Sequence, residues 1–255
     1  MIRCPVCQEA LTLFNKSYQC CNHHTFDVAK QGYVNLLLHQ KPAGDNLLMV
    51  KARKQVMDSG VFNPLMEAVT SLVASINPKF VCDVGCGEGT FMRALPSHIP
   101  HKFGIDISKV AISEASKRDK QALYLVASNY HLPFFHQSMD CLVNIIAPHA
   151  EEEFSRVCSQ TIVKVVPGRD HLKEMKMALY ETVQYHDPKK VEFPGFYLKN
   201  ETRIHYQALC HDPMTLIQMT PYFYTTPDLS SKPLTSPMLT TFDFIIYHYE
   251  REVTS

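Results

Sequence analysis

The stretch at residues 80–91, FVCDVGCGEGTF, constrains the fold of this chain more than any other part of it. It begins as an apolar strand over 80–84, and Gly85, Gly87 and Gly89 follow directly. Glycines remove the Cβ atoms where backbone passes close to a ligand, and the N–H groups that start the next helix point back at such a turn. The pattern predicts a nucleotide-like cofactor at the carboxyl edge of a parallel sheet.

Acidic residues around this turn indicate which kind of cofactor it holds. Asp83 precedes the glycines and Glu88 lies among them, and two carboxylates repel a phosphate. They suit a cofactor with a cationic, amino-acid-like end. A second predicted strand ends at Asp106, about twenty residues on, where an acid binds ribose hydroxyls. The alternative is a dinucleotide-binding Rossmann domain, which the acidic turn disfavours.

The segments DVGCGEG (83–89) and GIDIS (104–108) resemble the first two motifs of class I S-adenosylmethionine methyltransferases. The resemblance implies S-adenosylmethionine as the cofactor, with contacts from both motifs. The surrounding pattern agrees, because apolar segments alternate with helical ones and predict a doubly wound α/β sheet. We expect a Rossmann-like, mostly parallel seven-stranded sheet with strands at 80–84, 102–106, 123–127, 139–146, 161–166, 203–210 and 241–249, the last antiparallel.

The N-terminus carries a second motif, CPVC at 4–7 followed by CCNHH at 20–24. A CxxC pair with Cys and His about a dozen residues later has the spacing of a tetrahedral zinc site. Cys4 and Cys7 are clear ligands, whereas spacing alone leaves Cys20 or Cys21, and His23 or His24, for the other two positions. A segment of about forty residues buries little core, so a metal cross-link supplies stability that packing lacks.

The zinc motif continues into HTFDVAKQGYVNLL at 24–37. Together with DVGCGEG and GIDISKVAI (104–112), this resembles the RlmA-type 23S ribosomal RNA guanine-N1 methyltransferases over almost the whole chain. The resemblance implies methyl transfer to N1 of a guanine in a 23S rRNA hairpin, in domain II near the peptide exit tunnel, with macrolide-type resistance in some members. It also brings the expectation of a homodimer, which nothing in the sequence decides. The implied zinc ligands are Cys4, Cys7, Cys20 and His24.

Three further cofactor contacts come from the resemblance alone. Phe62 precedes the cofactor domain and aligns with an aromatic that lies against the cofactor, the alternative being a core aromatic. Asn129 follows the third strand in the segment that touches adenine in this fold. His171 aligns with a cofactor contact, the alternative being a partly exposed histidine at a helix start.

The loop after the fourth strand carries the expected chemistry. Its sequence, IAPH at 146–149, departs from the D/N-P-P-Y/F of amino-group methyltransferases and favours a ring nitrogen as acceptor. Guanine N1 holds a proton at neutral pH, so a general base assists its attack. His149 is the titratable residue of this loop and is the catalytic candidate.

Two other functions compete with this interpretation. One is a small-molecule methyltransferase, which needs no zinc ribbon. The other is a zinc-dependent RNA-binding protein without catalysis, and the presence of Asp83, Glu88 and Asp106 argues against it.

The domain boundaries are expected at 1–40 for the ribbon, 41–78 for a linker and helices, and 79–255 for the methyltransferase domain, with 185–202 as an insertion or substrate loop. The net charge of +0 indicates no general affinity for nucleic acid. A basic helix near residues 46–59 offers Lys51, Arg53 and Lys54 to phosphates.

Nine cysteines, an odd number with several in apolar strands, indicate a reducing cytoplasm. No apolar run is long enough for a membrane span, so we expect no membrane association.

Overall fold

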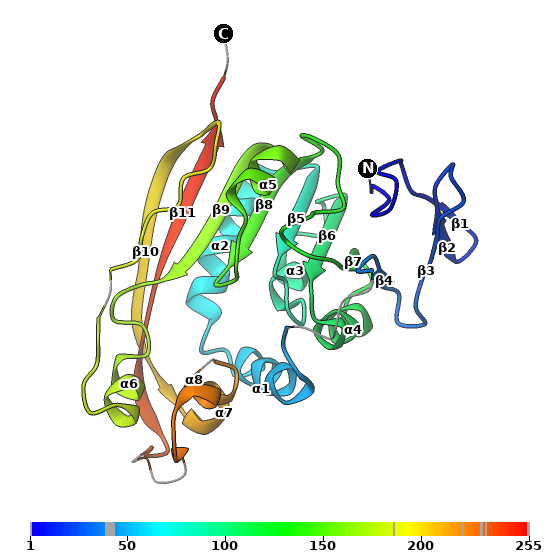
Figure 1. Cartoon of the computed structure of the whole chain (residues 1–255). Helices are drawn as coiled ribbons and strands as arrows, with labels where there is room; N and C mark the ends of the chain where they lie inside the picture. Colours follow the sequence, from blue (N-terminus) through cyan, green and yellow to red (C-terminus); the bar gives the residue numbers. More distant parts are fainter. Residues whose placement is uncertain are drawn as a thin grey trace.

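The computed structural model describes residues 2–38, 44–185, 187–220, 222–229, 232 and 234–253. Its centre is one mixed sheet with the strand order β10-β11-β9-β8-β5-β6-β7-β4 (Figure 1). β11 runs antiparallel between β10 and β9. The strands are β4 Val34–Asn35, β5 Phe80–Val84, β6 His101–Asp106, β7 Ala122–Val126, β8 Met139–Ile145, β9 Cys158–Pro167, β10 Phe196–Cys210 and β11 Met238–Arg251.

The sheet has eight strands, so the expectation of seven was wrong. The additional strand is β4, which directly follows the ribbon and pairs in parallel with β7, with Val34 opposite Leu125. Two residues are too short to show an alternating pattern, and the pairing partner lies far along the chain. The segment that we placed in the ribbon domain therefore forms the edge of the main sheet.

β10 also differs from the expected pattern, because residues 196–202 of the predicted 185–202 loop belong to this strand. Their side chains are mostly exposed on the outer strand of the sheet, and polar edge strands resemble loops in sequence. His186 of that loop and residues 39–43, at the expected boundary between ribbon and linker, lie outside the described residues.

Helices cover one face of the sheet. α2 contributes Val69, α3 contributes Phe91 and α4 contributes Ile112 to a buried cluster that also holds Val81 and Val143 of the sheet. The helices are α1 Leu47–Asp58, α2 Asn63–Ile76, α3 Thr90–Ala94, α4 Lys109–Arg118, α5 Glu151–Val157, α6 Lys173–Leu179, α7 Pro213–Gln218 and α8 Tyr222–Thr225.

The opposite face is covered by α5 and by the N-terminal ribbon, which is a small sheet of β1 (Thr12–Phe14), β2 (Ser17–Gln19) and β3 (Thr25–Asp27). The chain between β7 and β8 forms no helix, and the ribbon packs there instead: Ile2 bridges to Phe134, and Arg3 N donates to Pro133 O at 2.9 Å. The ribbon is thus part of the second hydrophobic core and not a separate body.

α1 lies at the carboxyl ends of the parallel strands (Figure 1). The Asn46 side chain caps it by accepting from Met49 N at 3.0 Å, and Ser108 Oγ at the end of β6 donates to Asp45 O at 2.6 Å. The helix therefore covers the edge where a cofactor is expected. Among the described residues, no helix is long and apolar enough to cross a membrane.

Candidate active site and metal centre

Four side chains of the ribbon converge on one point. The ligand atoms of Cys4, Cys7, Cys20 and His24 all lie within 4.8 Å of one another. Cys7 Sγ is 3.6 Å from Cys20 Sγ, and Cys20 Sγ is 3.3 Å from His24 Nδ1. Zn–S bonds of about 2.3 Å in a tetrahedron separate the sulfurs by roughly 3.8 Å, so the donor set and its spacing fit zinc.

Tight backbone turns bring these ligands together. Gln8 N donates to Cys4 O at 3.0 Å, and His23 N donates to Cys20 O at 3.0 Å. Cys4 and Cys7 therefore lie on one tight turn, and Cys20 and His24 on another. Cys21 and His23, which spacing alone allowed as ligands, are exposed and belong to no such cluster in the described residues.

The glycine turn is fixed at the carboxyl end of β6. Gly85 N and Cys86 N both donate to Ile105 O, at 2.7 and 2.9 Å. Asp106 completes the connection, because its Oδ2 accepts from Gly87 N at 3.0 Å and its Oδ1 from Ser108 N at 2.8 Å. Gly87 has φ of 55°, which a side chain would strain.

Asp83 is a buried carboxyl group. Its side chain is 2% exposed, and within the described part of the chain Oδ1 has no hydrogen-bond partner. Burial, and then the charge of Asp106, raises the pKa of Asp83 to about 8. A cation placed beside this oxygen would favour the ionised form.

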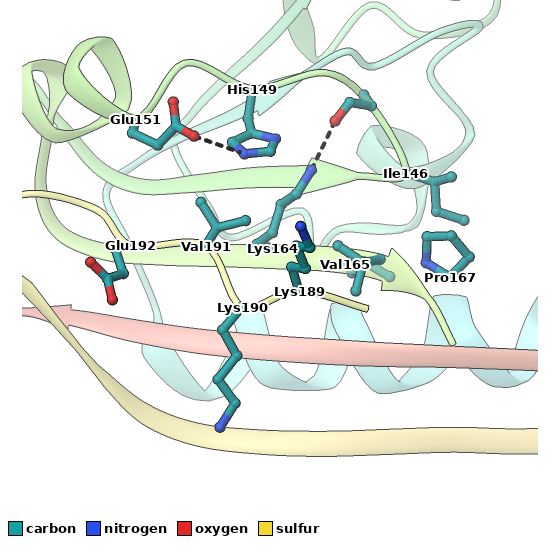
Figure 2. A pocket seen from close by; sticks show the side chains of 12 residues that line it. Ile146, His149, Glu151, Lys164, Val165, Pro167, Lys189, Lys190, Val191 and Glu192 are labelled. Carbon is teal, nitrogen blue, oxygen red and sulfur yellow. Dashed lines mark hydrogen bonds and ion pairs between the residues drawn. The ribbon is translucent and has the colours of Figure 1, made fainter. Parts of the chain in front are cut away.

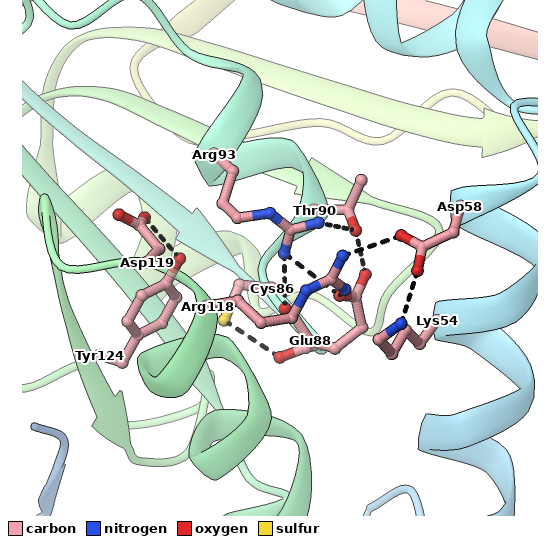
Figure 3. A network of polar contacts seen from close by, with 10 residues as sticks. Lys54, Asp58, Cys86, Glu88, Thr90, Arg93, Arg118, Asp119 and Tyr124 are labelled. Atoms are coloured by element: carbon pink, nitrogen blue, oxygen red, sulfur yellow. Dashed lines mark hydrogen bonds and ion pairs between the residues drawn. The ribbon is translucent and has the colours of Figure 1, made fainter. Parts of the chain in front are cut away.

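Glu88 lies in an ion network (Figure 3). Its carboxylate pairs with Arg118 at 2.8 Å and Arg93 at 3.4 Å and accepts from Thr90, and Arg118 also pairs with Asp58 of α1. The sequence places Glu88 among the residues expected to bind the cofactor. Two arginines neutralise it, so its observed role is to join the turn to α1, α3 and α4.

Basic residues of α1 are also engaged. Arg53 pairs with Asp45 and lies against the glycine turn, where a Cβ built on Gly87 would be 3.1 Å from its Nη1. Lys54 pairs with Asp58 at 2.6 Å, while Lys51 is exposed. Of the expected phosphate contacts, Lys51 is therefore the one directed to solvent without such an engagement in the described residues.

Phe62 and His171 meet on β11. The Phe62 ring is 5.3 Å from Phe242 and 5.8 Å from Phe244, and the His171 ring is 4.5 Å from Phe244. Burial lowers the pKa of His171 to about 3, so the imidazole is neutral. Both rings therefore pack on β11, and Phe62 belongs to the same buried cluster as Cys86 of the glycine turn.

The loop at 146–149 lies against the turn, and Asn129 is hydrogen-bonded to that loop. Asn129 Nδ2 donates to Pro148 O at 2.7 Å, and Asn144 Nδ2 donates to Val84 O at 2.6 Å. A Cβ on Gly85 would collide with the side chain of Ala147. The loop expected to hold the acceptor is therefore in direct contact with the turn expected to hold the cofactor.

A cavity of about 620 Å³ opens beside this loop (Figure 2). His149 lies on its wall, with Nε2 at 3.3 Å from Glu151 Oε1. Burial and the nearby Lys164 ammonium lower the pKa of His149 below its ordinary value. Sequence reasoning missed Lys164, whose signal was a single lysine within the apolar strand TIVKVVP (161–167).

Comparison with known proteins accounts for both parts of this chain. Residues 2–42 match the family model described as RlmA, N-terminal, and residues 81–168 match a methyltransferase domain. The 23S rRNA (guanine(748)-N(1))-methyltransferase of Streptomyces fradiae is 34% identical over 188 residues, which cover 70% of this chain and 67% of that protein. The chain belongs to the RlmA-type 23S rRNA (guanine-N1)-methyltransferase family.

Other relatives of this RlmA-type methyltransferase agree. A candidate 23S rRNA (guanine-N(1)-)-methyltransferase of Bacillus subtilis, YxjB, is 33% identical over 196 residues, which cover 71% of this chain and 69% of that protein. A chain in the solved complex between the Haloferax volcanii Trm112 methyltransferase activator and a candidate methyltransferase has a TM-score of 0.50 at 13% identity, over 83% of this chain and 100% of that chain. That similarity shows the class I methyltransferase fold.

An RlmA-type methyltransferase uses S-adenosylmethionine and zinc, and the residues present fit both. The partnerless Oδ1 of Asp83 suits the cationic amino group of the cofactor. Asp106 lies at the end of the second strand, in the position of a ribose-binding acid. The three sulfurs and one nitrogen of the ribbon suit zinc.

Proposed function

We propose that this protein transfers a methyl group from S-adenosylmethionine to N1 of a guanine in 23S rRNA. The observation that carries the proposal is its similarity to the Streptomyces fradiae enzyme, which is named for that reaction. The loop at 146–149 supports it, because it lacks the D/N-P-P-Y/F sequence of amino-group methyltransferases. The proposed RNA partner is the domain II hairpin near the peptide exit tunnel, with an effect on macrolide-type antibiotics as a consequence.

The target guanine must be unpaired or extruded, because N1 lies on its Watson–Crick edge. Phe14 on β1 of the ribbon has an exposed fraction of 62% and offers a ring for an unpaired base. Lys51 on α1 is exposed and offers a phosphate contact. They would give the proposed RNA one contact on the ribbon and one on α1.

The proposed cofactor contacts are grouped by what they would touch. Asp83 would hold the amino group, the glycine turn would allow close approach of backbone, and Asp106 would bind the ribose. Asn129 would lie at the adenine end, Phe62 and His171 would contact the cofactor as the family resemblance implies, and Glu88 would hold the turn through its arginines. Bound S-adenosylmethionine supplies a methyl group on a positively charged sulfur.

His149 is the proposed general base. Its lowered pKa leaves the imidazole neutral near pH 7, so it can accept the N1 proton, and Glu151 at 3.3 Å orients the ring. The loop that carries His149 contacts Gly85 through Ala147, so a base beside His149 would also lie beside the proposed cofactor site.

Changing His149 to Ala should lower kcat about 100-fold, since positioned proton transfer contributes at least this much. The affinity for S-adenosylhomocysteine, measured by calorimetry, should stay unchanged because His149 is not a proposed cofactor contact. The exposed His136, changed to Ala, is the matched control. An H149A enzyme with wild-type turnover would remove His149 from the mechanism.

The function is tested by methyl transfer from labelled S-adenosylmethionine to unmodified 23S rRNA, followed by mass mapping of the digest. N1-methylguanosine in the domain II hairpin is the expected product. Label on a small molecule but not on RNA would contradict the proposal and favour the competing function.

Location and assembly complete the proposal. An rRNA substrate would place the enzyme in the cytoplasm, with assembling ribosomes. A homodimer of this 29.1 kDa chain is the proposed oligomer. Light scattering after gel filtration measures it, and a mass of one chain would contradict it.

A further inference from the structure

Lys164 is a buried cation in the middle of β9, with only 3% of its surface exposed. Nζ donates to Asn144 Oδ1 and, at 2.8 Å, to Ala147 O, and no ion pair joins it to a carboxylate in the described residues. Burial lowers the pKa of Lys164 to about 8. The charge of Glu151 raises this pKa, but a buried charge that no direct ion pair neutralises still destabilises a fold, so its position calls for a functional explanation.

A second buried lysine shows what distinguishes Lys164. Lys102 on β6 is 4% exposed and donates to Leu95 O at 3.1 Å and Gln121 Oε1 at 3.4 Å. It is not among the residues that line the cavity of Figure 2, whereas Lys164 is. Lys164 combines equal burial with a position on the cavity, one hydrogen bond to Asn144 at the end of β8 and one to Ala147 in the loop at 146–149.

The cavity has the composition of a site for a flat heterocycle. Its volume of about 620 Å³ is in the range of ligand sites, about 300–1,000 Å³. Val165, Pro167 and Val191 give apolar walls for the faces of a base. The charged or titratable residues that face it are His149 and Glu151 from the loop and α5, Lys164 from β9, and Lys189, Lys190 and Glu192 from the segment that crosses it.

We propose that Lys164 binds O6 of the target guanine and stabilises the negative charge that develops there during methyl transfer. An ammonium group has three N–H donors, and the two observed hydrogen bonds use two of them. The third is available to a carbonyl oxygen in the cavity. This proposal rests on the proposed function, since it assigns the substrate contact of the same site.

The charges and bonds balance in this arrangement. The N1 proton moves to the neutral imidazole of His149, and the charge left on the base is shared between N1 and O6. The N1 electron pair forms the bond to the methyl carbon as the carbon–sulfur bond breaks, and that bond's electron pair stays on sulfur. Lys164 keeps all its protons and acts by position and charge, as oxyanion-stabilising donors do.

The same contact would select the base. Guanine presents an acceptor at position 6, whereas adenine presents an amino donor there. A donor facing a donor leaves both buried groups unpaired, and such mismatches discriminate strongly. Lys164 would therefore favour guanine over adenine at the methylated position.

Two variants remove the charge of Lys164, and one of them keeps a hydrogen-bond donor. Lys164→Gln keeps a donor for the Ala147 carbonyl but has no charge, and Lys164→Met has neither. We expect both to lower kcat on unmodified 23S rRNA about 100-fold, the usual effect of losing one such donor. Affinity for S-adenosylhomocysteine should change less than about threefold, because Lys164 is not at the cofactor turn, and Lys164→Arg should restore part of kcat.

The pKa of His149, followed by NMR in the free protein, gives a readout that needs no RNA. Lys164 is a charge that lowers this pKa, so Lys164→Met should raise it. Lys102→Met is the matched control, because it loses an equally buried lysine and should change neither this pKa nor kcat.

The outcomes distinguish the two proposals. Wild-type kcat in Lys164→Gln, or an unchanged His149 pKa in Lys164→Met, would overturn the role of Lys164 while the enzyme remains a guanine-N1 methyltransferase. A wild-type protein that labels no guanine N1 in 23S rRNA would refute the proposed function, and the role of Lys164 with it.

Discussion

Changing Asp83 to Asn should abolish cofactor binding and at the same time stabilise the cofactor-free protein. Asp83 Oδ1 has no hydrogen-bond partner in the described residues, so the charged form is held in place at a cost. The native pKa is about 8, and an unfolded aspartate has a pKa of about 3.9. The substituted asparagine would keep the shape of the side chain without a charge to bury.

The sign of the pH effect follows from these two values. Between about pH 4 and pH 8 the native carboxyl group holds a proton that the unfolded chain has released, so stability falls as pH rises through this range. The full cost, present above about pH 8, is several kcal/mol, at about 1.4 kcal/mol for each pH unit. Melting curves at pH 6 and pH 8.5 should therefore show the larger gain for D83N at pH 8.5.

Cofactor binding should show the opposite trend. An ionised Asp83 is needed to pair with the cationic amino group, so calorimetric affinity for S-adenosylhomocysteine should weaken as pH falls below about 8. D83N should bind at least about 100-fold more weakly, as expected for a lost buried charge pair. Asp187→Asn, at a side chain 79% exposed, is the control. Equal affinity in D83N would show that Asp83 does not hold the amino group.

Local patterns explain which parts of the fold and site could be predicted. β5 ends where the glycine turn begins, so the strand and the turn can be predicted from neighbouring residues. Asp106 can be predicted in the same way, because it ends the next apolar strand. The ligands of the ribbon were within reach because CxxC spacing is local, although choosing Cys20 over Cys21 needed the family resemblance or the folded turn.

Long-range pairing explains what could not be predicted. The two residues of β4 form a strand only because they pair with β7. The exposed residues 196–202 form part of a strand because they pair with β11. The ion network of Glu88 could not be predicted for the same reason, since its partner Arg118 lies farther along the chain, on α4. Lys164 stands out in the sequence as the one lysine of an apolar strand, but its position on the cavity becomes known only from the folded structure.

Removing zinc should destabilise the methyltransferase sheet as well as the ribbon. Structural zinc contributes about 10–16 kcal/mol to the folding of small domains, and the ribbon shares its core with Phe103 and Phe134 of the larger domain. Loss of the metal would expose these rings and free β4, the edge strand paired with β7. Cys20→Ser, or treatment of the wild-type protein with a chelator, should therefore lower Tm by more than about 10 °C, at about 2–4 °C for each kcal/mol.

Hydrogen exchange shows how far the destabilisation spreads. After chelation, faster exchange should extend from the ribbon into β4 and β7, because β7 loses its edge partner. Cys21→Ser is the matched control, since Cys21 is exposed and outside the ligand cluster, and it should retain zinc, Tm and exchange rates. Faster exchange confined to the ribbon, with β7 still protected, would mean that zinc organises an independent RNA-binding module. Exchange in both would mean that one metal holds the proposed RNA contact and the cofactor sheet in a single folding unit.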